Sequence, residues 1–349
     1  MGARDEGAVP FATVAIPVRN ESRTIEACLQ AVERQDYPHD RFEVLVLDGE
    51  SSDDTVAVVE RFAAVSDLDV RVLPNPGRTV PAALNVALAA ARGSRFVRVD
   101  GHSEPEATYL RLCVAGNDEH DADLAGGWVR AVGRNRFGRA VAAAFASPFS
   151  MGNAASWVAP AAPLEVASVP CGSYRIDALR AIGGFDEGQH ANQDYEANYR
   201  LRRAGGRAVL LPAVHFDYET RDTPRRLARQ FFRYGWFKAR TMVKHPASIR
   251  PRHLVPAAGL LGAVALVVGG AFWWPAFVVL AAGAALYACG VAAASAKGSA
   301  ERALLPFVFV TMHAAWAAGN LLGLARFVPA ARRLRQAPRP AHGLPVDRE

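Results

Sequence analysis

The sequence has few charged residues and few cysteines, and the common nucleotide-binding motifs are missing from it. Only 21% of its 349 residues are charged and 51% are hydrophobic, which is the reverse of the composition that keeps chains disordered. Its four cysteines, Cys28, Cys113, Cys171 and Cys289, are far apart, so they form neither a zinc motif nor a disulfide framework and predict a reducing compartment. No GxGxxG follows the first predicted strand and no GxxxxGK[ST] occurs, which argues against a dinucleotide-binding domain and a P-loop ATPase.

Two long stretches near the C-terminus are almost free of charge, residues 254–296 and 303–325. A helix rises about 1.5 Å per residue and the hydrocarbon core of a bilayer is about 30 Å thick, so roughly 20 apolar residues span it. The first stretch is long enough for two spans, broken at Trp273-Trp274-Pro275, and the second for one. We expect two or three apolar membrane helices. A buried helical hairpin in a soluble protein is the alternative.

A basic segment directly precedes these stretches. Between residues 221 and 252 the lysines and arginines are Arg221, Arg225, Arg226, Arg229, Arg233, Lys238, Arg240, Lys244, Arg250 and Arg252. Such a belt fits the anionic cytoplasmic leaflet of a membrane. Its interleaved aromatic residues would also suit a nucleic-acid surface. The adjacent apolar stretches favour membrane lipid as the partner instead, and we expect no binding of nucleic acid. Three spans would place the arginine-rich C-terminal tail outside the cell, whereas basic segments prefer the cytoplasmic side of a membrane. The number of spans therefore stays open.

The first hundred residues predict alternating strands and helices. Buried-strand patterns cover residues 13–17, 42–47, 70–73 and 96–99, and helical patterns cover 23–34, 55–64 and 81–91. This order predicts an α/β fold with a mostly parallel sheet and helices on both faces.

Polar residues follow three of these four strands. They are Arg19, Asn20 and Glu21 after the first, Asp48 after the second, and Asp100 with His102 after the fourth. Ligands of such sheets bind outside the carboxyl ends of the strands, although ordinary turns use the same residue types. A carboxylate and an imidazole two residues apart could hold Mg²⁺ or Mn²⁺ together with a diphosphate, and solvated loop residues fit the pattern equally well.

Two later segments also carry candidate chemistry. Asp194, after Gln193, opens a predicted helix, where it could cap the helix or take a proton from an acceptor hydroxyl. Gln230, Arg233 and Tyr234 lie in the basic aromatic segment. Arg233 could pair with a leaving diphosphate and Gln230 could donate a hydrogen bond, or the helix could anchor the chain to the membrane.

The motifs together resemble a known family. In order they are Pro17-Val18-Arg19-Asn20-Glu21, Asp48-Gly49-Glu50-Ser51-Ser52-Asp53, Asn75-Pro76 through Asn85, Val97-Arg98-Val99-Asp100-Gly101-His102, Val169-Pro170-Cys171-Gly172-Ser173-Tyr174-Arg175, Gly183-Gly184-Phe185-Asp186, Asp194-Tyr195-Glu196 through Arg202, and Gln230 through Tyr234. This ordered set is similar to the inverting family 2 glycosyltransferases of the GT-A fold, of the succinoglycan-biosynthesis type with a C-terminal membrane region.

The resemblance implies roles for individual residues. Asp100 would be the first acid of the family's metal-binding DxD, with His102 in place of the second, and Asp194 would be the general base. The family has Glu where this chain has Gln193. Gln230, Arg233 and Tyr234 would bind the diphosphate or the acceptor, and related synthases have Trp at the position of Tyr234. The nucleotide base and ribose would be surrounded by Pro17, Arg19, Glu21 and Asp48.

The resemblance and the apolar stretches also imply a layout and a function. The layout is a tail (1–10), a GT-A domain (11–220), basic interfacial helices (221–252), a membrane region (253–328) and a basic, Pro-rich tail (329–349). Because residues 1–10 lack an apolar run, the catalytic domain is expected in the cytoplasm, on a multi-pass plasma-membrane protein. The enzyme would move a sugar from a nucleotide-sugar donor to a hydroxyl of a lipid-linked glycan in cell-surface polysaccharide synthesis, with Mg²⁺ or Mn²⁺. A polyprenyl-phosphate sugar transferase, a processive synthase and a catalytically inactive membrane scaffold are the alternatives.

Overall fold

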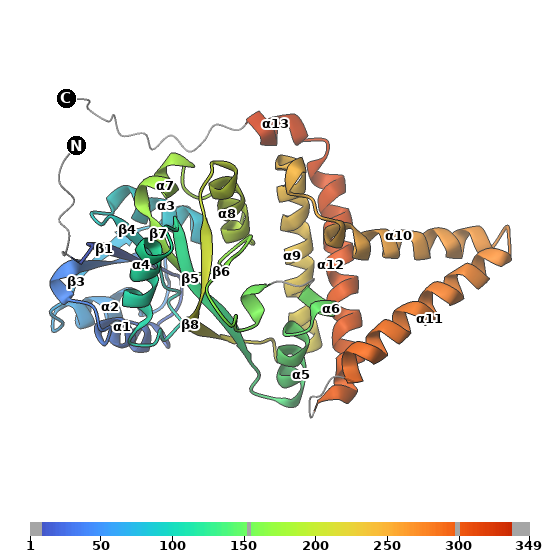
Figure 1. Cartoon of the computed structure of the whole chain (residues 1–349), viewed down its shortest axis with the longest axis horizontal. Coiled ribbons are helices and arrows are strands. Elements are labelled where there is room, and N and C mark those ends of the chain that lie inside the picture. Colours follow the sequence, from blue (N-terminus) through green and yellow to red (C-terminus); the bar gives the residue numbers. More distant parts are fainter. Residues whose placement is uncertain (1–8, 152–154, 297–300, 337–349) are drawn as a thin grey trace. The chain divides into compact units, whose positions relative to one another are not determined.

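The computed structural model describes residues 9–151, 155–296 and 301–336, and these form two compact units (Figure 1). Within the described residues, the first unit contains residues 9–129 and 159–216, and the second contains residues 130–151, 155–158, 217–296 and 301–336. Each unit is described by itself.

One eight-stranded sheet carries the first unit, in the order β3-β2-β1-β4-β7-β5-β8-β6. Its strands are β1 (Ala12–Val18), β2 (Phe42–Asp48), β3 (Asp69–Pro74), β4 (Arg95–Arg98), β5 (Leu124–Val132), β6 (Leu164–Glu165), β7 (Gly172–Arg175) and β8 (Ala208–Glu219). β1 pairs in parallel with β2 and β4, and β2 with β3, whereas β7 is antiparallel to both β4 and β5. The carboxyl ends of β1, β2 and β4 therefore lie at one edge, as the sequence predicts.

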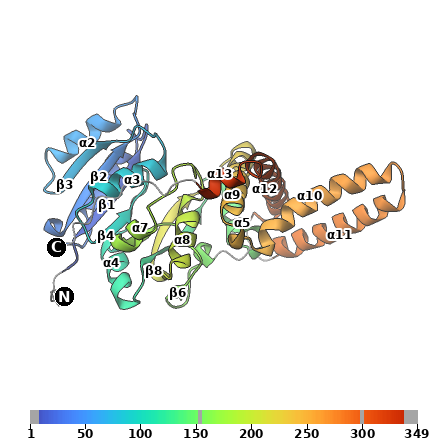
Figure 2. The same ribbon diagram turned by 90° about the horizontal axis from the view of Figure 1, so that it is seen from above.

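Helices cover both faces of this sheet (Figure 2). They are α1 (Ile25–Glu33), α2 (Thr55–Ala63), α3 (Val80–Ala90), α4 (Tyr109–Glu119), α7 (Ile176–Ala181) and α8 (Gln193–Arg203), with the 3₁₀ turn η1 (His39–Arg41). One apolar core joins Leu29 and Leu110, from α1 and α4, to the sheet, and a second core joins Leu84, Leu179 and Leu201, from α3, α7 and α8. The nearly continuous apolar runs of β1 and β2 are explained by burial on both faces. The predicted α/β architecture with a mostly parallel sheet is thus confirmed.

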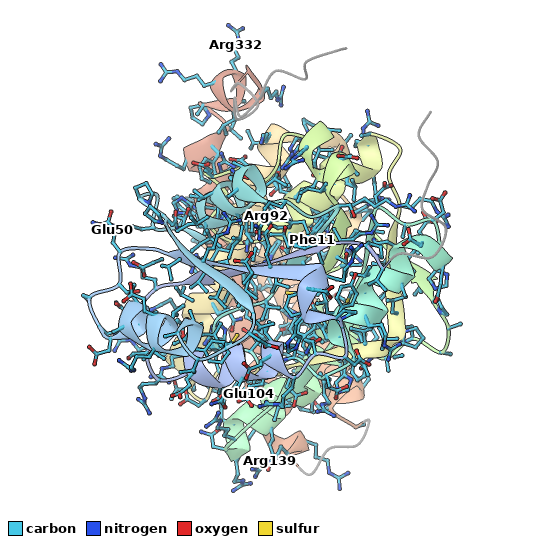
Figure 3. The ribbon with its side chains drawn as sticks, turned by 90° about the vertical axis from the view of Figure 1, so that its left-hand side faces the viewer. Phe11, Glu50, Arg92, Glu104, Arg139 and Arg332 are labelled. Carbon is cyan, nitrogen blue, oxygen red and sulfur yellow. The ribbon has the colours of Figure 1, made fainter. Side chains whose placement is uncertain are left out.

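At the opposite edge of the sheet, a buried carboxylate ties the strands together. Glu43 is fully buried and pairs with Arg71 and Arg92 at 2.5 and 2.9 Å. Arg92 also lies over the ring of Phe11, 5.9 Å from its centroid (Figure 3). These contacts hold the amino ends of β2 and β3 together.

The second unit is helical. Its helices are α5 (Arg136–Phe145), α6 (Pro148–Met151), α9 (Pro224–Lys244), α10 (Pro251–Gly270), α11 (Pro275–Ala296), α12 (Leu305–Phe327) and α13 (Ala331–Gln336), with short turns at η2 (Ala155–Trp157), η3 (Pro246–Ser248) and η4 (Arg302–Leu304). α9 and α12 lie side by side, and α10 and α11 form a hairpin (Figures 1 and 2). Within the described residues, three helices are long and apolar enough to cross a membrane: Pro251–Gly270, Pro275–Ala296 and Arg302–Phe327.

Candidate active site

The loops after β1 and β2 are bound to each other at the carboxyl edge of the sheet. Asn20 has a left-handed backbone (φ 57°), and its N–H donates to the Ser51 hydroxyl at 2.9 Å. In return the Ser52 N–H donates to the Asn20 side-chain oxygen at 2.8 Å. The Glu21 N–H donates to the Thr55 hydroxyl at 2.8 Å. The turn residues of the two strands therefore form one connected surface.

The predicted nucleotide-binding residues lie on this surface. Asp48 ends β2 and accepts a hydrogen bond from the Ser51 N–H at 3.2 Å. The N–H of Gly49 donates to Val18 at 2.9 Å, and a Cβ at Gly49 would lie 3.3 Å from the Cβ of Arg19. Pro17 is half-buried in β1. The structure thus brings Pro17, Arg19, Glu21 and Asp48 to one edge, and their contact with a nucleotide remains a prediction.

An arginine that sequence reasoning left without a role lies next to Asp100. The Nε of Arg98 donates to Asp100 Oδ1 at 2.8 Å, and only 12% and 29% of the two side chains are exposed. This buried guanidinium holds the pKa of the Asp100 carboxyl below its usual range, against the effect of burial. The signal in the sequence is a basic residue between Val97 and Val99 in an otherwise apolar strand.

Asp194 lies in the electrostatic field of the same arginine. It is in the first turn of α8, where its Oδ1 accepts from the Tyr195 N–H at 2.8 Å. Burial raises the pKa of the Asp194 carboxyl, the positive charge of Arg98 opposes that rise, and the negative charge of Asp100 adds to it. Although distant in sequence, the two acids therefore share one environment centred on Arg98. Cys171 shares it as well, since its thiol interacts electrostatically with all three.

His102, the predicted second metal ligand, is bonded to Glu21. The distance between His102 Nδ1 and Glu21 Oε1 is 3.2 Å, and this bond raises the pKa of His102 and lowers that of Glu21. Among the described residues, no group of three or more His, Cys, Asp or Glu side chains is arranged to hold a metal ion. A site for Mg²⁺ or Mn²⁺ on Asp100 and His102 therefore remains a prediction, in which water and phosphate oxygens would complete the ligand shell of the ion.

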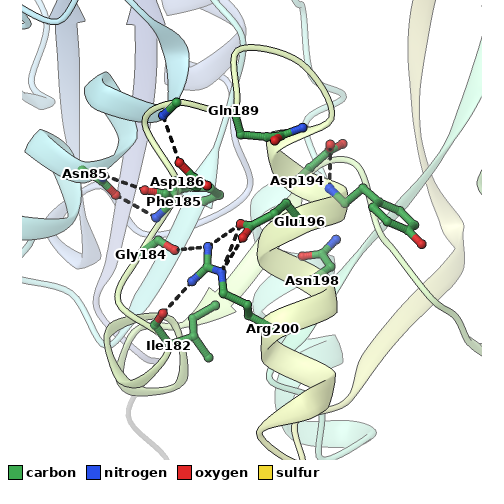
Figure 4. Close-up of polar contacts among 12 residues, drawn as sticks. Asn85, Ile182, Gly184, Phe185, Asp186, Gln189, Asp194, Glu196, Asn198 and Arg200 are labelled. Atoms are coloured by element: carbon green, nitrogen blue, oxygen red, sulfur yellow. Dashed lines mark hydrogen bonds and ion pairs between the residues drawn. The ribbon is translucent and has the colours of Figure 1, made fainter. Parts of the chain in front are cut away.

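A buried ion pair fixes the helix that carries Asp194 (Figure 4). Glu196 is fully buried and pairs with Arg200 at 2.7 Å. Arg200 in turn donates to the carbonyl oxygens of Ile182 at 2.5 Å and Gly184 at 2.7 Å. These contacts anchor α8 to the segment between α7 and α8, so Glu196 has a structural role.

Gln230, Arg233 and Tyr234 lie on α9, in the second unit. Gln230 is buried; its Nε2 donates to the Tyr234 hydroxyl at 2.8 Å and its Oε1 accepts from Arg221 Nε at 3.2 Å. Arg233 is exposed. Their predicted action on a diphosphate or an acceptor remains a prediction.

A mostly parallel α/β sheet with acidic residues such as Asp48 and Asp100 after its strands is typical of glycosyltransferases of the GT-A fold. The sequence profile described as "Glycosyl transferase family 2" matches residues 13–183. The chain belongs to glycosyltransferase family 2, and it is a glycosyltransferase of polysaccharide or glycan biosynthesis.

Several known proteins are similar over most of the chain. The succinoglycan biosynthesis protein ExoA of Rhizobium meliloti (strain 1021) is 30% identical over 321 residues, which cover 90% of this chain and 95% of that protein. A dolichyl N-acetyl-alpha-D-glucosaminyl phosphate 3-beta-D-2,3-diacetamido-2,3-dideoxy-beta-D-glucuronosyltransferase of Methanococcus voltae is 25% identical over 232 residues, 64% of this chain and 72% of that one. The mannosyltransferase PcManGT of Pyrobaculum calidifontis, solved with GDP-Man and Mn²⁺, has the same fold, with a TM-score of 0.55 and 23% identity over 92% of this chain and 89% of its own.

Proposed function

We propose that this enzyme moves a sugar from a nucleotide-sugar donor to a hydroxyl group of a lipid-linked glycan, with inversion of configuration at the anomeric carbon. The observation that carries the proposal is the pairing of Arg98 with Asp100 in a position where its charge also acts on Asp194. That arrangement supports roles for Asp100 on the diphosphate side and for Asp194 as a separate base within one site.

Asp194 is the general base of the proposed reaction. The acceptor hydroxyl gives its proton to the Asp194 carboxylate while its oxygen forms a bond to the anomeric carbon. The bond between that carbon and the diphosphate breaks, and its electron pair leaves with the nucleoside diphosphate. Burial makes Asp194 a stronger base than an exposed carboxylate, and Arg98 keeps it ionised.

The donor end of the site is formed by the residues at the strand ends. Pro17, Arg19, Glu21 and Asp48 contact the nucleotide, and Asp100 with His102 would hold Mg²⁺ or Mn²⁺. Such an ion neutralises charge on a departing diphosphate. The GDP-Man and Mn²⁺ bound to the fold relative PcManGT support this assignment.

A lipid-linked acceptor fits the rest of the chain. Three helices long and apolar enough to span a membrane follow the basic helix α9, and this order supports a multi-pass protein of the plasma membrane with its catalytic unit on the cytoplasmic side. Gln230, Arg233 and Tyr234 of α9 bind the diphosphate or the acceptor. The Methanococcus relative is named for transfer to a dolichyl phosphate-linked sugar, which supports this choice of acceptor.

Transfer by the purified full-length protein tests the proposal. The protein in detergent is incubated with nucleotide sugars, Mn²⁺ and a membrane lipid extract, and nucleoside diphosphate release and sugar in the lipid fraction are measured. We expect Asp194→Asn and Asp100→Asn to lose at least ~100-fold of the transfer rate, as for other catalytic groups. The matched control is Asp67→Asn, which removes an exposed carboxylate just before β3, at the opposite edge.

Three results would contradict the proposal. Full activity of Asp194→Asn would favour a polyprenyl-phosphate sugar transferase, which needs no hydroxyl-activating base. Transfer only to soluble acceptors would exclude the lipid-linked substrate. Absence of any donor turnover by the wild-type protein would favour a scaffold.

A further inference from the structure

The three apolar helices differ in what surrounds them. In the spanning windows, 17% of the α10 residues and 11% of the α11 residues are buried inside the protein, but 39% of the α12 residues are. At about 1.5 Å per residue, the 20 residues of α10 and the 22 residues of α11 each reach across a hydrocarbon core of about 30 Å. Phe272, Trp273 and Trp274 are exposed at the turn between them, where aromatic rings suit a lipid–water interface.

α12 is packed against a helix that cannot enter hydrocarbon. A Cβ on Gly319 of α12 would lie 2.0 Å from the Phe232 carbonyl oxygen of α9, and a Cβ on Gly235 of α9 would lie 2.1 Å from the Trp316 carbonyl oxygen of α12. The two backbones are therefore in direct contact along this stretch. α9 carries seven lysines and arginines in its 21 residues, and such charges are strongly disfavoured inside a bilayer. Because α12 is packed along α9, it should stay outside the hydrocarbon core together with α9.

Both ends of α12 are attached to parts of the chain outside the membrane. Just before its first turn, Glu301 pairs with Arg136 at 3.3 Å and Arg139 at 2.8 Å, both on α5. Beyond its last turn, the Nε of Arg335 on α13 donates to the Val243 carbonyl oxygen at the end of α9, at 3.1 Å. Figure 3 shows Arg139 and Arg332 at the two ends of the second unit. In the described residues between α5 and α9 there is no candidate span, so these anchor points lie on one side of the membrane.

The outer face of α12 is apolar. Phe307, Val310 and Leu322 are exposed and lie on one side of the helix by their spacing. A helix with one face on protein and an apolar face outward suits the plane of the lipid–water interface.

We propose that only α10 and α11 cross the membrane, as a hairpin with its turn at residues 271–274 on the far side. α12 lies in the interface beside α9, and α13 is on the same side as α9 and the catalytic unit. Two crossings return the chain to its starting side, so Arg326, Arg332, Arg333 and Arg335 join the basic face of α9, as the charge rule requires. This inference rests on the proposed membrane location and defines the surface that meets the lipid.

Cysteine labelling of the full-length protein in intact cells tests this arrangement. The parent carries Cys289→Ala, which removes the exposed cysteine and gives the blank. Single cysteines are then added as Ala271→Cys at the turn, Arg333→Cys on α13, and Val65→Cys on the exposed surface of the catalytic unit. With a membrane-impermeant maleimide we expect only Ala271→Cys to be labelled in intact cells, and all three after permeabilisation.

Each other labelling pattern overturns the inference. Labelling of Arg333→Cys in intact cells, with Val65→Cys protected, would show that α12 crosses. Labelling of Ala271→Cys only after permeabilisation would show that the hairpin does not cross. Alkaline phosphatase fused after Gln336 is a second measurement that does not depend on a cysteine variant folding: we expect it to be inactive, and an active fusion would overturn the inference.

The outcome is separable from that of the proposed function. Transfer is assayed on the same cysteine variants, and it does not depend on the labelling. The expected labelling without transfer would contradict the proposed function alone, and transfer with a labelled Arg333→Cys would contradict the topology alone.

Discussion

Adding one methyl group at Gly319 tests the contact between α9 and α12. In Gly319→Ala the new Cβ would lie 2.0 Å from the Phe232 carbonyl oxygen and 3.0 Å from its Cα, well inside the 3.4 Å at which ordinary contact begins. These are backbone atoms of a helix, so they cannot rotate away as a side chain would. We therefore expect a cost at the upper end of overpacking, about 3 kcal/mol, offset by about 1 kcal/mol of helix propensity.

Gly283→Ala is the matched control. It adds the same methyl group to a glycine of α11 that has no atom within 4 Å of the new Cβ, so we expect a gain of about 1 kcal/mol. The two variants should therefore differ by about 3 kcal/mol, which corresponds to roughly 6–12 °C in midpoint temperature for a unit of this size. Thermal unfolding of the full-length protein in detergent measures the difference. Equal midpoints for the two variants would refute the close approach of α9 and α12.

Four further predictions concern the site. Arg98→Gln should lower the free energy of unfolding by about 3 kcal/mol, because it leaves a buried carboxylate without its partner; Arg98→Lys should lower it less, and equal unfolding midpoints for the two would contradict the pairing. Because the pKa of Asp194 is raised and a base must be ionised, kcat/KM should fall as the pH drops through a value above the ordinary carboxyl range of about 4. Arg98→Gln should move this acidic fall of kcat/KM to higher pH, because the variant lacks the positive charge that opposes protonation of Asp194. An unchanged pH profile in Arg98→Gln would show that Arg98 does not keep Asp194 ionised. Glu196→Gln should lower the midpoint temperature of unfolding by removing the buried partner of Arg200, and the acidic fall of kcat/KM should stay in place if Glu196 is only structural. Chelation with EDTA should abolish transfer and Mn²⁺ or Mg²⁺ should restore it; full activity in EDTA would contradict the metal role of Asp100 and His102.

The strand ends of the first unit could be predicted because the pattern that buries a strand also shows where it stops. Residues 13–17 and 42–47 were expected as strands, and the structure has β1 at Ala12–Val18 and β2 at Phe42–Asp48. An apolar run covered on both faces ends where polar turn residues begin, so the sequence alone assigns Glu21, Asp48 and Asp100 to one edge of the sheet. The resemblance to family 2 supplied the roles, which spacing alone left open between turns and chemistry.

Arg98 could not be assigned in the same way. A basic residue in an apolar strand indicates a buried partner, but it does not say which one. Asp100 is two residues away in the sequence, and Asp194 is on a helix far along the chain. The structure around them includes β7 pairing antiparallel to β4, with Val97 opposite Ser173, and the ion pair that holds α8. Both are long-range contacts that local pattern does not contain. The contact that the sequence does not reveal is thus the pairing of Arg98 with Asp100, whose arginine also acts electrostatically on Asp194.

The same limit explains why hydropathy left the number of spans open. Mean hydropathy depends on composition alone. By that measure both helices qualify as membrane spans, since the mean hydropathy is 1.4 for α12 and 2.1 for α11. What separates the two helices is their partner: α11 presents its apolar surface outward, whereas α12 presents Gly319 and Gly323 to the backbone of a basic helix. Small residues four apart on an apolar helix indicate close helix packing without saying whether it occurs in lipid or in water. The charge on the partner helix decides between the two, and in the proposed arrangement the seven basic residues of α9 hold α12 at the interface and prevent it from crossing the bilayer.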